Sequence, residues 1–186
     1  MPAPRWFERL LFVAGLACLG WAGATWLQAY HFQGEQSRLL ETMARTSPPK
    51  AAALATDPAA PIGRLEIPRL GVSVVVMPGD DDATLMKGVG HLPDTPLPWN
   101  GGNTAFAGHR DTFFRPLERV TIGDDIHLDT PRGRFHYRVR RTIVVEPEDL
   151  WVLDRSTRAT LTLITCYPFH YIGPAPKRFI VQADRT

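Results

Sequence analysis

The sequence predicts an all-β domain that follows one membrane-spanning helix. Two observations support this fold class. From Ile62 onward, short β-branched and aromatic runs alternate with clusters of Gly, Pro and Asp, a pattern typical of a closed barrel or a sandwich. Before that point, residues 10–34 contain no Asp, Glu, Lys or Arg, and about 20 apolar residues cross the hydrocarbon core of a bilayer as a helix.

The N-terminal segment is expected to hold the chain in a membrane. Arg5 and Arg9 precede the apolar run, which places residues 1–9 in the cytoplasm and the rest outside. Aromatic residues common at membrane interfaces gather at its far end: Trp21, Trp26 and Tyr30. A cleaved signal peptide is the alternative, because residues 22–24 offer a small-x-small site. Apolar residues continue past that site, so we expect an anchor over residues 10–32.

Residues 33–61 are expected to form an extracytoplasmic linker. Residues 35–45 can continue the helix outward, and residues 47–61 are rich in Pro and Ala. The β-rich domain then occupies residues 62–186. Its clearest strand is 135–145, where apolar and polar residues alternate with a period of two. The other expected strands are 72–77, 104–107, 125–129, 160–166 and 178–183, and only 82–88 and 114–119 look briefly helical.

Composition argues against two classes of site. The net charge of +2 gives no clustered basic excess, so no nucleic-acid partner is expected. The histidines and the two cysteines, Cys18 and Cys166, lack the spacing of zinc ligands. The acidic run 80–82 is compatible with calcium, although a solvated turn is the preferred interpretation. The sequence therefore predicts neither a cofactor nor a metal.

Cys166 is the first candidate for catalysis. It ends the apolar run 160–166, and Pro168 stops the strand two residues later. A buried, inert thiol is the more common fate of a free cysteine. However, residues 167–177 lead to a strand that begins at Arg178, and antiparallel pairing would make Arg178 a neighbour of the thiol. The guanidinium would then favour the thiolate or stabilise an oxyanion, unless it is only a solvated edge charge.

A cysteine nucleophile normally needs a histidine that the fold brings close. His109 follows the strand 104–107 through Gly108, and His170 lies in the loop after Cys166. The residues alone rank these two equally. The other four histidines suit the membrane boundary, surface strand faces or a structural position: His31, His127, His136 and His91.

These segments resemble the sortase family. Thr162-Leu163-Ile164-Thr165-Cys166 matches the T-L-x-T-C signature of sortases, Ala107-Gly108-His109-Arg110 matches their histidine motif, and Arg178 falls at their arginine position. The resemblance covers about residues 63–183. The segments Gly108–Phe114 and Cys166–Phe169 look most like class D sortases.

The resemblance implies an eight-stranded β-barrel and a transpeptidase mechanism. Cys166 would attack an L-P-x-T-G-like sorting signal to form a thioester, with His109 as acid/base and Arg178 at the oxyanion. Thr162, Thr165 and Tyr167 are expected to bind substrate. An amine acceptor of the cell envelope or a pilin would then take the acyl group.

Two rival functions remain at this point. The same three groups would serve a cysteine endopeptidase or thioester hydrolase, in which water ends the reaction. A non-catalytic, membrane-tethered binding module would lack one of the three groups, and all three are present. The segment 92–95 reads Leu-Pro-Asp-Thr, like a sorting signal, but it is interpreted as a structural loop because Pro96 follows.

Overall fold

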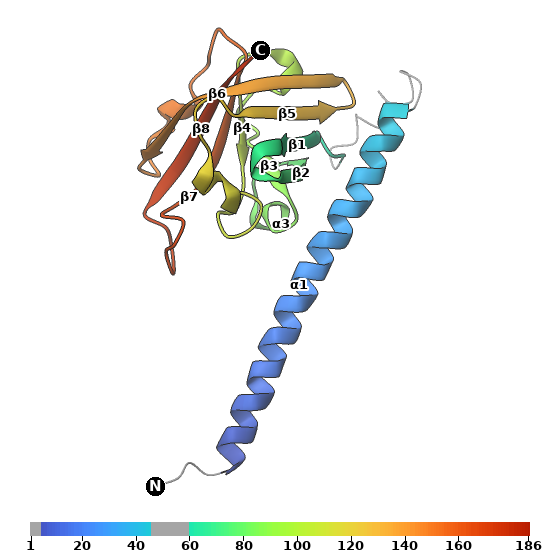
Figure 1. Cartoon of the computed structure of the whole chain (residues 1–186), viewed down its shortest axis with the longest axis vertical. Coiled ribbons are helices and arrows are strands. Elements are labelled where there is room, and N and C mark those ends of the chain that lie inside the picture. Colours follow the sequence, from blue (N-terminus) through green and yellow to red (C-terminus); the bar gives the residue numbers. More distant parts are fainter. Residues whose placement is uncertain (1–4, 46–59) are drawn as a thin grey trace.

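A computed structural model describes residues 5–45 and 60–186 (Figure 1). Eight strands close into one barrel in the order β1-β2-β3-β4-β7-β8-β6-β5. The β2–β3 and β4–β7 pairs are parallel, and the other pairs are antiparallel. The strands are β1 (Gly63–Ile67), β2 (Val72–Pro78), β3 (Val89–His91), β4 (Asn103–Ala107), β5 (Asp125–Thr130), β6 (Gly133–Val145), β7 (Thr160–Tyr167) and β8 (Lys177–Arg185).

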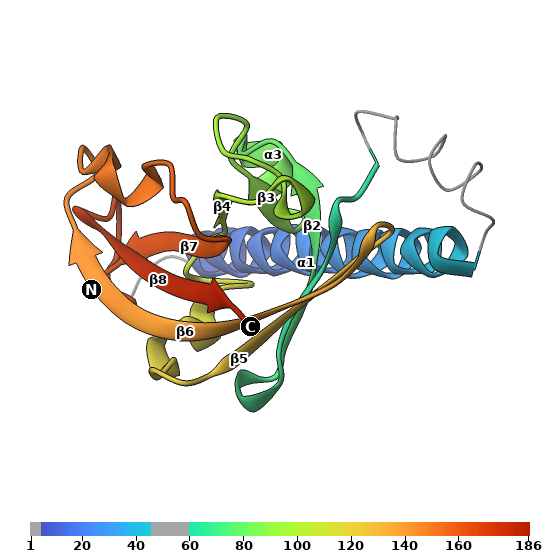
Figure 2. The same cartoon turned by 90° about the horizontal axis from the view of Figure 1, so that it is seen from above.

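The closed barrel confirms the predicted fold and decides between barrel and sandwich. Figure 2 shows β5, β6 and β8 curving around one side, with β2, β3 and β4 on the other. Short helical segments lie in the connections: α3 (Asp82–Leu85), η1 (Pro68–Leu70), η2 (Pro98–Asn100), η3 (Arg115–Arg119) and η4 (Leu150–Leu153). The two strands that the sequence did not predict, β1 and β3, are short.

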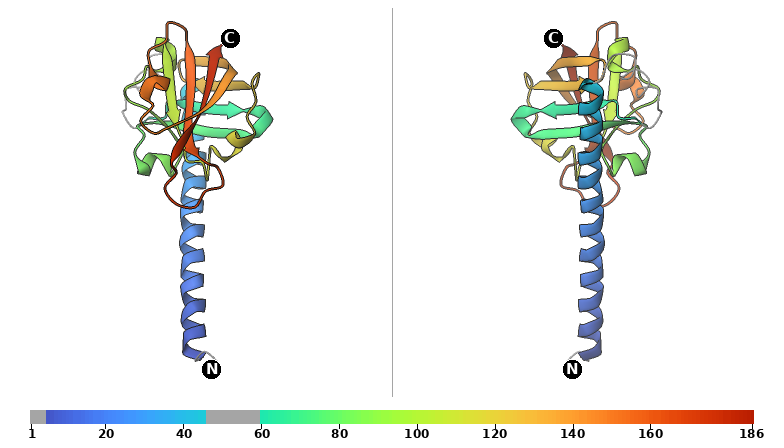
Figure 3. Two further views of the ribbon diagram at one scale, coloured as in Figure 1. Left: turned by 90° about the vertical axis from the view of Figure 1, so that its left-hand side faces the viewer. Right: turned by 90° about the vertical axis from the view of Figure 1, so that its right-hand side faces the viewer.

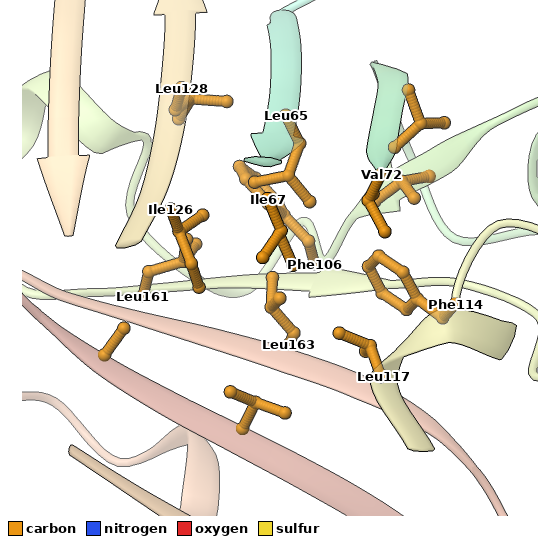
Figure 4. Close-up of a cluster of buried hydrophobic side chains, with 14 of the residues drawn as sticks. Leu65, Ile67, Val72, Phe106, Phe114, Leu117, Ile126, Leu128, Leu161 and Leu163 are labelled. Carbon is orange, nitrogen blue, oxygen red and sulfur yellow. The ribbon is translucent and has the colours of Figure 1, made fainter. Parts of the chain in front are cut away.

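The barrel interior is filled by apolar side chains from all eight strands. Figure 4 shows Phe106 of β4, Leu163 of β7 and Ile126 of β5 converging with Phe114, which follows β4. Full burial of a large apolar side chain contributes roughly 1.5–3 kcal/mol. The alternating pattern of β6 turns its apolar positions inward, including Tyr137, where burial raises the pKa to about 12.

The N-terminal helix α1 (Arg5–Arg45) runs without a break through the expected anchor and into the expected linker. The predicted outward continuation over residues 35–45 is therefore present, while most of the Pro/Ala-rich stretch lies outside the described residues. By length and composition, the span Trp6–Met43 contains a segment able to cross a membrane, with a mean hydropathy of 1.8 in its most apolar 18-residue window. None of that window is buried against the barrel.

The C-terminal half of α1 packs on the barrel beside β1 and β2 (Figure 3, right). The side-chain amide of Gln33 satisfies two backbone groups there. Its Nε2 donates to the Lys87 carbonyl at 2.6 Å, and its Oε1 accepts from the Val75 amide at 2.9 Å. One turn further toward the C-terminus of the helix, the Ser37 hydroxyl accepts a hydrogen bond from Arg64. These bonds fix the helix at one place on the barrel wall.

Candidate active site

His109 and Cys166 lie at the neighbouring ends of β4 and β7. The two strands run parallel, with Ala107 opposite Ile164. The pairing continues one step further, because the Gly108 amide donates to the Ile164 carbonyl at 3.1 Å. Continued by the same register, His109 on the β4 side falls opposite Cys166 on β7. Neighbouring parallel strands place such residues side by side.

Gly108 is required for this approach. A Cβ at this position would lie 2.7 Å from a ring carbon of Phe114, a core residue. Any larger residue would force either the Phe114 ring or the histidine segment to shift. The Thr165 hydroxyl adds a second tie, since it donates to the Gly108 carbonyl at 2.7 Å.

Arg178 reaches the same place from the other side of Cys166. It is the direct antiparallel partner of Cys166 in the β7–β8 ladder, as the sequence predicted. Its Nη1 donates to the backbone carbonyls of Ala175 and Lys177, at 3.2 and 3.1 Å. The guanidinium is half-buried and keeps further N–H groups for another acceptor.

The His109 ring and the Cys166 thiol are both half-buried. Within residues 5–45 and 60–186, neither side chain has a hydrogen-bond or ion-pair partner. The strand register thus brings a half-buried imidazole and a half-buried thiol to adjoining strand ends, with polar atoms that no described residue engages.

His170, the rival candidate, is held elsewhere. Its Nε2 lies 2.9 Å from a Glu118 carboxylate oxygen, and Arg115 Nη2 lies 2.9 Å from its Nδ1. The His170 side chain is 71% exposed. Both partners belong to η3, so the His170 ring is part of a surface charge cluster. His109, in contrast, follows β4, the strand beside β7.

Arg110 is a site residue that the sequence did not reveal. It is only 6% exposed, and its guanidinium donates to three carbonyls of the β7–β8 loop, those of Pro168, Tyr171 and Gly173, at 2.8, 2.6 and 3.2 Å. It thereby ties the segment that carries His109 to the loop that follows Cys166. In the sequence, Arg110 opens a polar turn, and nothing there distinguishes a buried arginine from a solvated one.

The three predicted substrate-binding residues have different surroundings. Thr162 is fully buried and donates to Asn103 Oδ1 at 2.7 Å, and Thr165 is buried on Gly108. Both hydroxyls are thus engaged within the barrel, and contact of either threonine with substrate stays a prediction. Tyr167 is half-buried and stacks on Phe179 with ring centroids 6.3 Å apart; its contact with substrate stays a prediction.

The acidic run and the sorting-signal-like segment both have local structural roles. The Asp81 carboxylate accepts from the amide and the hydroxyl of Thr84, which caps α3 and lowers the pKa of that carboxyl. In the segment 92–95, the buried Thr95 hydroxyl donates to the Leu92 carbonyl at 2.8 Å. Within the described part of the chain, no cluster of three or more His, Cys, Asp or Glu residues is arranged to hold a metal.

Comparisons with known proteins point to one family. The family model "Sortase domain" matches residues 65–186. Sortase D of Bacillus subtilis (strain 168) is 38% identical over 125 residues, which are 67% of this chain and 63% of the Bacillus protein. The chain thus spans less than two thirds of this relative. The class D name agrees with the subclass that the sequence resembles.

Two solved structures share the fold. The sortase D5 transpeptidase of Clostridium perfringens superposes with a TM-score of 0.75 at 24% identity, over 84% of this chain and 99% of that one. Sortase C of the same species, solved with the C-terminal cell wall sorting motif, gives a TM-score of 0.70 at 22% identity, over 82% and 98%. With the barrel order, the motifs and the family match in agreement, this chain belongs to the sortase family.

Proposed function

We propose that this protein is a membrane-anchored cysteine transpeptidase. The observation that supports the proposal is the strand register, which pairs Arg178 with Cys166 and puts the His109 segment beside the end of β7. A lone cysteine in such a barrel has little value for a tethered binding module, whereas a nucleophile, a proton carrier and an oxyanion donor together form an acyl-transfer site.

The reaction has two halves. The Cys166 thiolate attacks the carbonyl carbon between Thr and Gly of an L-P-x-T-G-like signal, and the oxyanion is stabilised by Arg178. His109 protonates the leaving amine, so the C–N bond breaks and a thioester remains. An acceptor amine of the cell envelope or of a pilin then attacks the thioester, gives its proton to His109 and takes the acyl group.

The substrate class rests on the family. One structurally similar sortase was solved with a C-terminal cell wall sorting motif, and we carry that chemistry to this chain as part of the proposal. The anchor rests on α1, whose uncharged run follows Arg5 and Arg9. The topology proposed is single-pass, with residues 1–9 in the cytoplasm and the barrel outside.

A nucleophile competition assay tests this function. The protein is incubated with a library of L-P-x-T-G-like peptides, with and without an added amine, and the products are identified by mass spectrometry. A transpeptidase forms the ligated product in proportion to the amine. Only hydrolysed peptide at every amine concentration would establish the endopeptidase alternative.

Cys166→Ala is the accompanying variant. It should abolish both cleavage and the acyl-enzyme mass, because the only other thiol, Cys18, lies on α1 outside the barrel. Cys18→Ser is the matched control and should retain both. Cleavage by the Cys166→Ala protein would overturn the assignment of the nucleophile.

A further inference from the structure

The loop between β7 and β8 exposes an isoleucine completely. Ile172 is 100% exposed, and Tyr171 beside it is 45% exposed. The loop is nevertheless held in place, since Arg110 binds its carbonyls and lies 5.8 Å from the centre of the Tyr171 ring. A fixed loop therefore presents a small apolar tip, Tyr171 and Ile172, to its surroundings.

The strand register shows which end of the barrel carries this loop. β3 and β4 are antiparallel with Gly90 opposite Ala107, so the chain before Gly90 lies beside the chain after Ala107. β4 and β7 are parallel, so the chain after β7 emerges at the same end. The α3–β3 connection, the His109 segment and the β7–β8 loop therefore share one end of the barrel, the catalytic end.

The helix α1 meets the barrel near this end. Gln33 binds the Lys87 carbonyl in the α3–β3 connection, and Lys87 Nζ lies 5.7 Å from the centre of the Phe32 ring. The residues that precede Phe32 on the helix form the uncharged run. In Figures 1 and 3, the N-terminal half of α1 runs away from the barrel on the side toward which the orange-red β7–β8 loop and α3 project.

We propose that the catalytic end of the barrel rests on the lipid bilayer, with Ile172 and Tyr171 inserted at its surface. The inference rests on the proposed membrane anchor. Lipid is the occupant because Gln33, at the end of the uncharged run, is hydrogen-bonded directly to the barrel, so the apolar part of the helix leaves the barrel at this point. Apolar and aromatic side chains are favoured at that depth. Met86, 60% exposed after α3, is a second contact on the same end.

The arrangement also orients the active site. Cys166 lies at the foot of the β7–β8 loop, so insertion of the loop tip directs the thiol toward the membrane plane. A sorting signal held at the bilayer surface would meet the thiol directly, whereas one presented from above the barrel would not.

A single-site fluorescence experiment tests the insertion. The full chain carrying Cys18→Ser and Cys166→Ala has no native thiol, and Ile172→Cys then accepts an environment-sensitive dye. The protein is reconstituted into phosphatidylcholine/phosphatidylglycerol vesicles that contain spin-labelled lipid. We expect a blue-shifted emission that the spin label quenches.

Leu150→Cys in the same background is the matched control. Leu150 is 66% exposed on η4, and the neighbouring Val152 carbonyl accepts from Asn103 at the start of β4, the opposite end of the barrel. The dye at this position should emit as in water and resist quenching. Quenching at both positions would mean that the barrel has no fixed orientation and would overturn the proposal.

Flotation separates the two proposals. Vesicle flotation without quenching at position 172 would overturn the membrane-facing loop and leave the anchor standing. Failure to float would overturn both. As a second readout, Ile172→Asp in the active chain should keep its turnover of a soluble peptide and lose several-fold against the same peptide coupled to lipid. An equal effect on both peptides would overturn the membrane contact of Ile172 and assign this residue to the site itself.

Discussion

The two ends of the β4–β7 strand pair use polar side chains in opposite ways. At the start of these strands, Asn103 accepts from Thr162 at 2.7 Å and donates to the Val152 carbonyl at 3.0 Å. Gln182 of β8 donates to the same carbonyl at 3.1 Å. At the other end, the His109 ring and the Cys166 thiol have no such partner among the described residues.

The difference separates structure from chemistry. Buried polar groups normally satisfy each other, and a network that does so rigidifies the core. Polar groups that stay unsatisfied beside one another, and within reach of solvent, are placed for a substrate. On this criterion the barrel has a structural end and a reactive end, and substitutions should affect stability at one and turnover at the other.

After the loss of the Cys166 thiol itself, the largest effect is expected for His109, the proposed proton carrier at the reactive end. His109→Ala should lower kcat/KM by about 10²–10⁴-fold, the usual contribution of general acid–base catalysis. His170→Ala, the matched control, should keep a substantial fraction of the activity because its ring is engaged by Glu118 and Arg115. Peptide cleavage rates measure both. The reverse order of effects would assign the proton transfer to the loop histidine.

Arg178→Ala is expected next in size. It should slow acylation by about 10²–10³-fold, as when one oxyanion donor is removed. The thiol should still react with iodoacetamide. Arg178→Lys should recover only part of the rate, because an ammonium lacks the planar fork of donors. If Arg178→Ala were acylated at the wild-type rate, the oxyanion role would be wrong and Arg178 would be only a charge at the strand edge.

At the structural end, Thr162→Val should act on stability alone. It removes the hydroxyl between Asn103 and Gln182, and an unsatisfied buried partner costs about 1–3 kcal/mol. The free energy of unfolding, measured with urea in detergent, should fall while acylation of folded protein stays unchanged. Thr142→Val, at an exposed position of β6, should be neutral. A catalytic loss without a stability loss would restore Thr162 as a substrate contact.

The smallest expected effect is a pH dependence at His91. Burial lowers the pKa of this imidazole, which contacts the Thr95 hydroxyl at 3.2 Å. As pH falls below about 6.5, the unfolded chain binds the proton first, so stability is lost on acidification and is fully present at higher pH. Unfolding at pH 7.5 and 5.5 should show this loss, and His91→Gln should flatten it. Equal slopes in both proteins would contradict the burial argument.

Local sequence pattern was sufficient where a strand is long or a ladder is simple. β6 was predicted because its period of two extends over many residues, and the Cys166–Arg178 pairing followed from one short antiparallel connection. β3 was missed because three residues carry no period. Close packing requires a glycine at position 90 of this strand, since a Cβ there would lie 2.2 Å from the Gly79 carbonyl oxygen.

The rest of the site depends on contacts far apart in sequence. Nothing local separates His109 from His170, and only the parallel β4–β7 register and the charges around His170 distinguish them. The burial of Arg110 depends on carbonyls about 60 residues later, at Pro168 and Tyr171. The hydrogen bond between Thr162 and Asn103 of the neighbouring strand likewise depends on the fold, and the motif around Thr162 gives no sign of it.

The parallel pairing of β4 and β7 also bears on how the enzyme is made. The Thr165–Gly108 bond joins residues 57 positions apart, and the intervening chain forms β5 and β6 before β7 can pair. Contacts between residues so far apart in sequence form late in folding, because closing the long loop between them has a large entropic cost. The strand ends that carry Cys166 and His109 thus come together only in a nearly complete barrel, and an unfinished chain holds them apart.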